Sequence, residues 1–283
     1  MNHLFYNPKA NNGEAYKDLD MIKRTLDGQT VREYNLLEFD DYTDLLEQIR
    51  PEDVVYIVGG DGTLNRFINN SRNLSIFGDI YFYSAGTGND FKHDVDPDGK
   101  LYRIRLNDYI ANLPVVNVKG KDYKFINGIG FGIDGYCCEE GDRIHAVGKG
   151  PVNYTGIAVK GCLLKFKPCN ATITVDGVSR KYKNVWLAPA MLGKYYGGGM
   201  KVAPNQERGN PEHLLSSVVM YGTGRLKTLI RFPKIFSGEH IRYKDMVEIY
   251  QGHEIKVQFD RPCALQVDGE TIPDVTEYTA RYE

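Results

Sequence analysis

The clearest pattern of hydrophobic and polar positions lies in Val54–Phe67, which reads VVYIVGGDGTLNRF. The segment opens with β-branched and aromatic residues, a composition typical of a strand that is buried on both faces of a parallel sheet. After the glycine-rich stretch Gly59–Thr63, the apolar residues Leu64, Phe67 and Ile68 recur at helical spacing. The pattern therefore predicts a strand, a tight turn and the start of a helix.

A turn of this kind attracts phosphate. The first N–H groups of a helix have no partner within the helix, and glycines let a ligand come close to the backbone. The stretch Gly59–Thr63 lacks the Lys-Ser/Thr pair of a Walker A loop and the spacing of a GxGxxG motif. The simpler alternative is an ordinary strand-to-helix turn in which Asp61 is a local cap.

The rest of the N-terminal half alternates between strand and helix patterns. Strands are predicted at His3–Asn7, Val31–Leu37 and Asp79–Ser84, and helices at Glu14–Leu26 and Tyr42–Ile49. This alternation is typical of right-handed βαβ units and a parallel sheet. Because ligands of such sheets bind where the strands end, three polar loops are expected to converge there. These loops are Asn7–Gly13, Gly59–Thr63 and Gly86–Asp90.

The pattern changes after about Pro114, where short strands and turns predominate. The predicted strands are Val115–Val118, Tyr123–Ile126, Ala171–Val175, Val178–Pro189, Leu214–Tyr221, Val247–Tyr250, Ile255–Phe259 and Ala264–Val267. Helices are predicted at Ile133–Val147 and Val152–Phe166. We therefore expect an α/β nucleotide-binding domain at 1–113 and a β-rich, sandwich-like domain at 114–283. The last strand of the chain could return to the first domain.

The segment Arg225–Phe236 combines apolar and basic residues. Leu226, Leu229, Ile230 and Phe232 alternate with Arg225, Lys227, Arg231 and Lys234. The simpler interpretation is a surface helix whose apolar stripe lies in the core and whose charges are solvated. The alternative is a basic amphipathic helix that touches a membrane surface.

Composition narrows the class of protein. The chain has 283 residues and a formal net charge of -2, which gives no argument for a nucleic acid partner. No apolar run approaches the ~20 residues that span a bilayer, and the N-terminus does not resemble a signal peptide. The five cysteines include no CxxC spacing, so buried thiols are expected rather than disulfides or a zinc site.

Several polar residues fit the needs of phosphoryl transfer. This reaction needs a backbone cradle for the phosphates, carboxylates for Mg²⁺ and a base near the accepting hydroxyl. Gly59–Thr63 and Gly86–Asp90 can form the cradle, Asn89 included, and they supply the carboxylates Asp61 and Asp90. Asp268 and Glu270 follow a predicted strand on an Asp-Gly-Glu turn. Alone, such a turn usually indicates only a hairpin.

Together these segments resemble the diacylglycerol kinase catalytic-domain family, which includes related bacterial lipid kinases and the ceramide and sphingosine kinases. The resemblance rests on motifs that follow one another in the family's order along the whole chain. They are Tyr6-Asn7-Pro8-Lys9, GGDGT at Gly59–Thr63 with Leu64-Asn65, GTGNDF at Gly86–Phe91, the Gly-rich Phe125–Gly132, Gly197–Asn205 and Asp268-Gly269-Glu270.

The resemblance implies a fold like that of NAD kinases and diacylglycerol kinases, with ATP in a cleft between two domains. It implies nucleotide contacts from Asn7, Pro8, Lys9, Ala10 and Asn11, from Gly60, Asp61, Gly62, Thr63, Leu64, Asn65 and Arg66, and from Thr87. In the family the Asp-Gly-Glu turn carries the catalytic base, so Asp268 or Glu270 would take the proton from a lipid hydroxyl. The residues do not distinguish between the two.

Two departures from the family pattern bear on mechanism. Asn117 stands where diacylglycerol kinases commonly have an Asp. Bacterial members also hold a structural Mg²⁺ on a stretch that differs here, in which Glu212 would replace the ligand Asp and Ser216 the last Asp. We place the corresponding metal at Gly209, Glu212 and Leu214, and the longer Glu side chain puts that metal in doubt.

We therefore expect an ATP- and Mg²⁺-dependent lipid kinase that phosphorylates diacylglycerol or a related lipid. One alternative is a kinase for a soluble acceptor such as NAD, and another is a nucleotide-binding regulatory module that has lost catalysis. The expected partner is a lipid substrate at the membrane surface, met transiently, by a cytoplasmic enzyme that visits the inner face of the membrane. A homodimer is compatible with the sequence.

Overall fold

The computed structural model describes residues 1–10, 15–26, 28–71, 78–86, 88–147, 156–157 and 165–282. Its contacts divide the chain into two compact units, Met1–Leu113 and Pro114–Glu283. Three of the sequence-based predictions lie outside the described residues, wholly or in large part. They are the nucleotide contacts of Asn11 and Thr87 and the helix Val152–Phe166.

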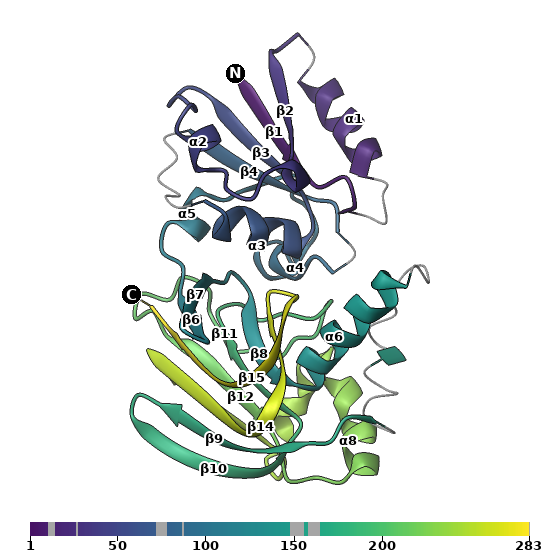
Figure 1. The fold of residues 1–283 in the computed structure, drawn as a ribbon, viewed down its shortest axis with the longest axis vertical. Helices are drawn as coiled ribbons and strands as arrows, with labels where there is room; N and C mark the ends of the chain where they lie inside the picture. The colour runs from purple at the N-terminus through teal and green to yellow at the C-terminus, as the bar shows by residue number, and fades with distance from the viewer. Residues whose placement is uncertain are drawn as a thin grey trace. The chain divides into compact units, whose positions relative to one another are not determined.

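The first unit is built on a five-stranded sheet with the order β2-β1-β3-β4-β5 (Figure 1). Its strands are β1 (Asn2–Tyr6), β2 (Val31–Asn35), β3 (Val54–Gly59), β4 (Asp79–Ser84) and β5 (Ile104–Arg105). The first four run parallel, as predicted, and β5 pairs antiparallel with β4 at the edge. The helices are α1 (Ala15–Thr25), α2 (Thr43–Leu46), α3 (Asp61–Asn69), α4 (Asp90–Val95) and α5 (Asn107–Ile110), with a 3-10 turn, η2, at Leu36–Glu38.

Alternating side chains of the first sheet pack against helices on its two faces. On one face, Leu4 and Tyr56 join Leu19 and Ile22 of α1 in a buried cluster. On the other face, the ring of Phe5 lies 5.6 Å from that of Phe67 in α3. Successive side chains of β1 and β3 point to opposite faces of the sheet, and helices cover both faces. Consecutive residues of these strands are therefore buried, which explains their continuous hydrophobic pattern.

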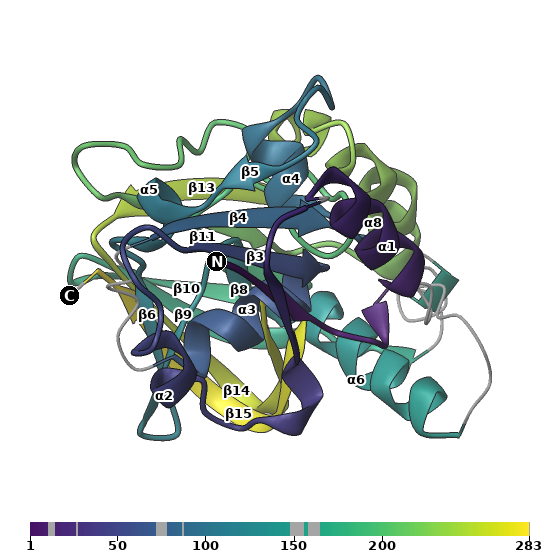
Figure 2. The same ribbon diagram turned by 90° about the horizontal axis from the view of Figure 1, so that it is seen from above.

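The second unit is an antiparallel sheet of ten strands (Figure 2). The strands are β6 (Val115–Val118), β7 (Lys121–Lys124), β8 (Gly128–Gly132), β9 (Cys169–Val175), β10 (Val178–Val185), β11 (Leu187–Met191), β12 (Leu215–Met220), β13 (Val247–Gly252), β14 (Glu254–Val267) and β15 (Glu270–Arg281). The helical elements are α6 (Ile133–Ala146), α8 (Arg225–Arg231) and the 3-10 turns η4 (Phe232–Ile235) and η5 (Glu239–Arg242). Buried side chains from the sheet, α6 and η4 form its core.

The strand pattern of this half needs several corrections, and one of them is that the Gly-rich segment Gly128–Gly132 is a strand, β8, which the pattern did not predict. The predicted strand Val178–Pro189 is two strands, because β10 pairs with β9 whereas β11 pairs with β8 and β12. The two predicted strands at Ile255–Phe259 and Ala264–Val267 are one, β14, with register shifts around Cys263. The sequence pattern did not predict β15, which pairs with β14 and β6 and therefore stays in the second unit.

The cysteines form no disulfide among the described residues. Cys137, Cys138, Cys169 and Cys263 are free thiols, and the first and third of them are buried. The sulfur atoms of Cys169 and Cys263 lie 3.1 Å apart.

Candidate active site

The three predicted loops of the first unit meet at the carboxyl ends of β1, β3 and β4. The Nδ2 atom of Asn7 donates to Oγ1 of Thr63 at 3.4 Å, which joins the first loop to the second. The N–H of Ala85 donates to the carbonyl of Gly59 at 2.8 Å, which joins the third loop to the second. Parallel strands end at one edge of a sheet, and the convergence predicted from the pattern is therefore present.

Two glycines let the second and third loops touch. A Cβ atom on Gly86 would lie 2.6 Å from the Cα of Gly60, closer than real side chains approach. Within the second loop, a Cβ atom on Gly59 would lie 2.3 Å from Oγ1 of Thr63. The first hydrogen bond of α3 runs from Leu64 N to the carbonyl of Gly60, so the N–H groups that precede Leu64 have no acceptor within the helix.

Asp61 fastens the second loop to the third. Its Oδ2 accepts the N–H of Asp90 at 2.8 Å and its Oδ1 accepts the N–H of Phe91 at 3.0 Å. Asp61 therefore caps α4, which begins 29 residues further along the chain. Asn89 precedes α4 in the left-handed conformation, with φ 51°, and its Oδ1 accepts from Ser84 and from the N–H of Gly86. Each carboxylate oxygen can accept more than one bond, so Asp61 can also face a cation.

The other predicted nucleotide contacts lie in the first loop and on α3. In the first loop, Oδ1 of Asn7 accepts the N–H of Lys9 at 2.9 Å, a local turn that shapes the backbone through Pro8 and Ala10. On α3, Leu64 and Asn65 are buried. The Arg66 guanidinium donates to the Tyr42 hydroxyl and the Phe39 carbonyl, which lie outside the three loops. These contacts of Arg66 give it a structural role, because they bind α3 to the segment 39–42.

In the second unit, Asp268 is a buried anchor. It lies in the turn between β14 and β15 with φ 48°, and its side chain accepts three backbone N–H groups. Those donors are Ile126 at 2.7 Å, Asn127 at 2.8 Å and Gly128 at 2.9 Å. The N–H of Asp268 in turn donates to the carbonyl of Gly128 at 3.0 Å. The turn is thereby held against the Gly-rich segment that opens β8.

Glu270, two residues later, is exposed. The Gly269 N–H between the two acids donates to Oε1 of Gln266 at 2.8 Å. The structure therefore separates two carboxylates that the sequence left equivalent. The carboxylate oxygens of Asp268 accept hydrogen bonds from backbone N–H groups, whereas Glu270 is exposed at the surface of the turn.

A second buried acid of this unit, Asp134 in the first turn of α6, was not identified from the sequence. The Tyr196 hydroxyl donates to its Oδ2 at 2.9 Å, and its Oδ1 is buried without a hydrogen-bond partner among the described residues. Burial raises the pKa of Asp134 to about 6, although the hydrogen bond from the Tyr196 hydroxyl lowers it. A Cβ on Gly130 would lie 1.9 Å from Oδ2, so the Gly-rich strand β8 makes room for this carboxyl group.

Arg208 was not identified from the sequence either. Its guanidinium donates to the carbonyl of Ile126 and, at 3.1 Å, to Oδ1 of Asn127. Arg208 and Asp268 therefore hold the segment 126–128 from two sides, one through carbonyl and amide oxygens and the other through N–H groups. The only signal in the sequence was that Arg208 lies in the stretch that departs from the family pattern.

The loop predicted to hold a structural metal is closed by amide side chains. The Leu214 carbonyl accepts Nε2 of Gln206 and Nδ2 of Asn210, both at 2.9 Å. Oε1 of Gln206 accepts the Ser216 hydroxyl at 2.5 Å. The described residues include no group of three or more His, Cys, Asp or Glu side chains placed to hold a metal ion. Mg²⁺ at Gly209, Glu212 and Leu214 stays a prediction, and this donor set does not fit it.

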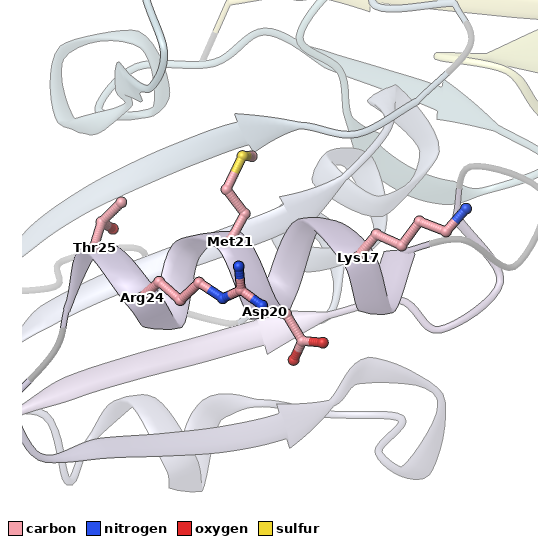
Figure 3. Close-up of a pocket in the computed structure, with 5 residues that line it drawn as sticks. All are labelled: Lys17, Asp20, Met21, Arg24 and Thr25. Atoms are coloured by element: carbon pink, nitrogen blue, oxygen red, sulfur yellow. The ribbon is translucent and has the colours of Figure 1, made fainter.

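Two further places carry no part of the site. Asn117, which stands where the family commonly has an Asp, donates to Asp122 at 2.6 Å across the β6–β7 hairpin. Figure 3 shows a hollow on the surface of α1, lined by Lys17, Asp20, Met21, Arg24 and Thr25. None of its lining residues belongs to the predicted site, and we assign the hollow no role.

Comparison with protein families identifies the class. Residues 2–109 match the diacylglycerol kinase catalytic domain, and residues 127–280, more than half of the chain, match the YegS C-terminal NAD kinase β-sandwich-like domain. The chain therefore belongs to the diacylglycerol kinase family.

Individual relatives are distant. The chain is 24% identical to "Putative lipid kinase YtlR" of Bacillus subtilis over 235 residues, which cover 76% of this chain and 72% of that protein. It is 23% identical to a diacylglycerol kinase of Mycobacterium tuberculosis over 69% of this chain and 63% of that protein. A crystal structure of a diacylglycerol kinase from Bacillus anthracis has the same fold, with a TM-score of 0.62 at 16% identity, and the match covers 100% of this chain and 93% of that one.

In the part of the chain that the structure describes, none of the helices has the length and apolar character needed to cross a bilayer.

Proposed function

We propose that the protein is an ATP- and Mg²⁺-dependent lipid kinase that transfers the γ-phosphoryl group to a hydroxyl of diacylglycerol or a related lipid. The observation that carries this proposal is the contact of two glycine loops at Gly60 and Gly86, where α3 begins. Membership of the diacylglycerol kinase family supports a phosphotransferase, and the names of the relatives favour a lipid acceptor.

The first unit supplies a phosphate site. The N–H groups at the start of α3 and the positive end of its helix dipole would bind phosphate oxygens. Gly59, Gly60 and Gly86 let the loops pack this closely around the start of α3, since a Cβ atom at these places would crowd Thr63 or the opposite loop. Asn7 and Thr63, joined at 3.4 Å, lie where the first loop meets this site.

Asp61 and Asp90 are the residues that would hold Mg²⁺. Bound there, the cation would neutralise the negative charge that develops on the phosphate oxygens. The carboxylate of Asp61 is fixed in direction by two backbone N–H groups, and Asp90 is 5% exposed at the start of α4. Fixed carboxylates suit Mg²⁺, which requires nearly regular octahedral geometry.

We assign the general base to Glu270 and a positioning role to Asp268. The three N–H groups on Asp268 stabilise it as an anion and occupy its oxygens, which leaves it poorly placed to take a proton from a substrate. Glu270 would accept the proton of the lipid hydroxyl while that oxygen bonds to the γ-phosphorus and the bond to ADP breaks. Asp268 would keep the turn fixed on the segment 126–128, so that Glu270 is correctly directed.

The test is transfer of label from γ-labelled ATP with Mg²⁺ to a panel of acceptors in mixed micelles. The panel holds diacylglycerol, monoacylglycerol, ceramide, a sphingoid base and undecaprenol, with NAD in solution. We expect labelled diacylglycerol or another labelled lipid and no labelled NAD. Label on NAD alone would identify a kinase of a soluble acceptor, and ATP binding without transfer to any acceptor would contradict the lipid kinase proposal.

A further inference from the structure

The helix α8 exposes apolar side chains that a folded protein normally buries. Leu226 and Ile230 lie four residues apart, on one side of the helix, and are 70% and 69% exposed. Phe236, just after η4, is 39% exposed. We call Leu226, Ile230 and Phe236 the α8 surface. Figure 1 places α8 at the border of the second unit.

The opposite side of the same segment explains why these residues stay outside. Thr228, Phe232 and Ile235 are buried, and the latter two belong to the main core of the second unit. The Thr228 hydroxyl also bonds to Thr223 at 2.6 Å and to the Gly224 carbonyl at 3.2 Å. Turning the helix to bury Leu226 and Ile230 would expose this set, and the exposure is therefore fixed by the packing. The simpler expectation from the sequence, an apolar stripe within the core, is wrong for these two residues.

The segment that carries the α8 surface is rich in cations. The segment Arg225–Asp245 contains six Lys and Arg residues but only two Asp and Glu residues, a net charge of +4 in a chain whose net charge is -2. Asp245 pairs with both Lys227 at 2.5 Å and Arg231 at 2.7 Å, so this group of three charges remains positive. Exposed apolar side chains on a segment of net positive charge complement the acyl chains and headgroups at an anionic bilayer surface.

We propose that the α8 surface docks the protein onto an anionic membrane, with Leu226 and Ile230 entering the interface and the surrounding cations facing lipid phosphates. The inference rests on the proposed function, because an enzyme that phosphorylates a water-insoluble lipid must take it from a bilayer. Two apolar residues and a net charge of +4 suit weak, reversible binding that increases with the anionic lipid content.

The experiment measures how much full-length protein sediments with vesicles. Wild type is compared with Leu226→Glu/Ile230→Glu on vesicles of phosphatidylcholine alone and with 40% phosphatidylglycerol, a composition chosen as about that of an anionic bilayer. Val178→Glu is the matched control, because Val178 is 54% exposed at the β9–β10 hairpin of the same unit. We expect wild type and Val178→Glu to bind the anionic vesicles equally, and the double variant to lose about tenfold or more in partitioning.

The charges are tested separately with Arg242→Glu/Lys244→Glu, which should also weaken binding to anionic vesicles. Equal binding of wild type to both kinds of vesicle, or unchanged binding of the Leu226/Ile230 variant, would overturn the proposal. So would a loss of self-association in that variant without a loss of vesicle binding, since the surface would then join two copies of the chain. Equal unfolding temperatures for all variants are required, which excludes misfolding as the cause of any loss.

The same variants separate this inference from the proposed function. With a short-chain, water-soluble diacylglycerol, the Leu226/Ile230 variant should keep the wild-type rate, whereas with vesicle-borne diacylglycerol its rate should fall with its partitioning. If wild type phosphorylates no lipid at all, the kinase proposal fails. Vesicle sedimentation still decides whether the α8 surface binds membranes.

Discussion

Asp268 and Glu270 lie two residues apart on one turn, yet their surroundings suit different roles. Asp268 is buried and receives three backbone N–H groups, whereas Glu270 is exposed. We predict that Asp268→Asn lowers the free energy of unfolding by about 1–3 kcal/mol, because the new NH₂ group would face a backbone donor in place of an acceptor. Urea unfolding measures the change.

Glu270→Gln is the matched control for that measurement, since an exposed carboxylate contributes little to stability. Its unfolding free energy should equal that of wild type within about 0.5 kcal/mol. A stable Asp268→Asn variant would mean that the three N–H contacts do not anchor the turn, and the distinction between the two acids would lose its basis.

The buried carboxyl group of Asp134 should make the free energy of unfolding fall as the pH rises. Burial raises its pKa from 3.8 to about 6, so the folded protein binds more protons than the unfolded chain between these values. The free energy of unfolding contributed by Asp134 therefore falls as pH rises from about 4 to about 6, and is constant above that range. Four neighbouring groups either affect the pKa of this carboxyl group or have their own pKa affected by it. They are Tyr196, Tyr278, Cys138 and the Gln266 amide.

Asp134→Asn removes this titration. The stability of the variant relative to wild type should rise across pH 4 to 6 by up to the order of 3 kcal/mol and then level off. Denaturant unfolding of both proteins at several pH values gives the difference directly. A difference that is independent of pH would show that Asp134 does not carry the shifted pKa.

At the scale of elements, the contact between the two glycine loops is the feature most sensitive to a single methyl group. Gly86→Ala would place a Cβ atom 2.6 Å from the Cα of Gly60, so the loops must separate. We expect ATP affinity to fall about tenfold or more and stability to fall by about 1–3 kcal/mol. Isothermal titration with ATP and Mg²⁺ measures the affinity. Gly224→Ala is the control, because a Cβ atom there meets nothing within 4 Å. Unchanged ATP affinity in Gly86→Ala would show that the contact between the two loops is not needed to bind ATP.

The loop between Gln206 and Ser216 gives a prediction about metal removal. Its Leu214 carbonyl already accepts two amide donors, so EDTA should leave the unfolding temperature of the nucleotide-free protein unchanged. Asn210→Asp would replace a donor by a carboxylate facing the same carbonyl, which should destabilise the loop by about 1–3 kcal/mol and make it responsive to added Mg²⁺ or Ca²⁺. A wild-type protein that EDTA destabilises would restore the structural metal predicted from the family.

The sequence predicted the elements whose pattern is local. The strand and helix around Gly59–Thr63, the parallel order of the first four strands and the meeting of three loops all follow from periodicity. The partners of Asp61, Asp268 and Arg208 did not follow, because they lie 29 to 142 residues away and depend on how strands pair. The exposure of Leu226 was likewise hidden, since apolar residues occupy both sides of α8 and only the packing selects one.

At the scale of the whole molecule, the proposed chemistry is divided between two units with separate cores. The first unit contains the glycine loops and the carboxylates proposed for Mg²⁺, and the second contains the proposed base and the α8 surface. Net charge is also divided, because Arg225–Asp245 is strongly positive within a chain that is slightly negative. Phosphoryl transfer should therefore depend on both units, whereas nucleotide binding should depend on the first.

The most direct test of the account is the rate of phosphate transfer from ATP to diacylglycerol by wild type and Glu270→Gln, measured side by side with ATP affinity. We predict that wild type forms phosphatidic acid, and that Glu270→Gln lowers kcat by about 10²–10⁴ while the Kd for ATP changes less than about threefold. Transfer at an undiminished rate in Glu270→Gln, or the absence of any lipid product from wild type that binds ATP, would contradict the account.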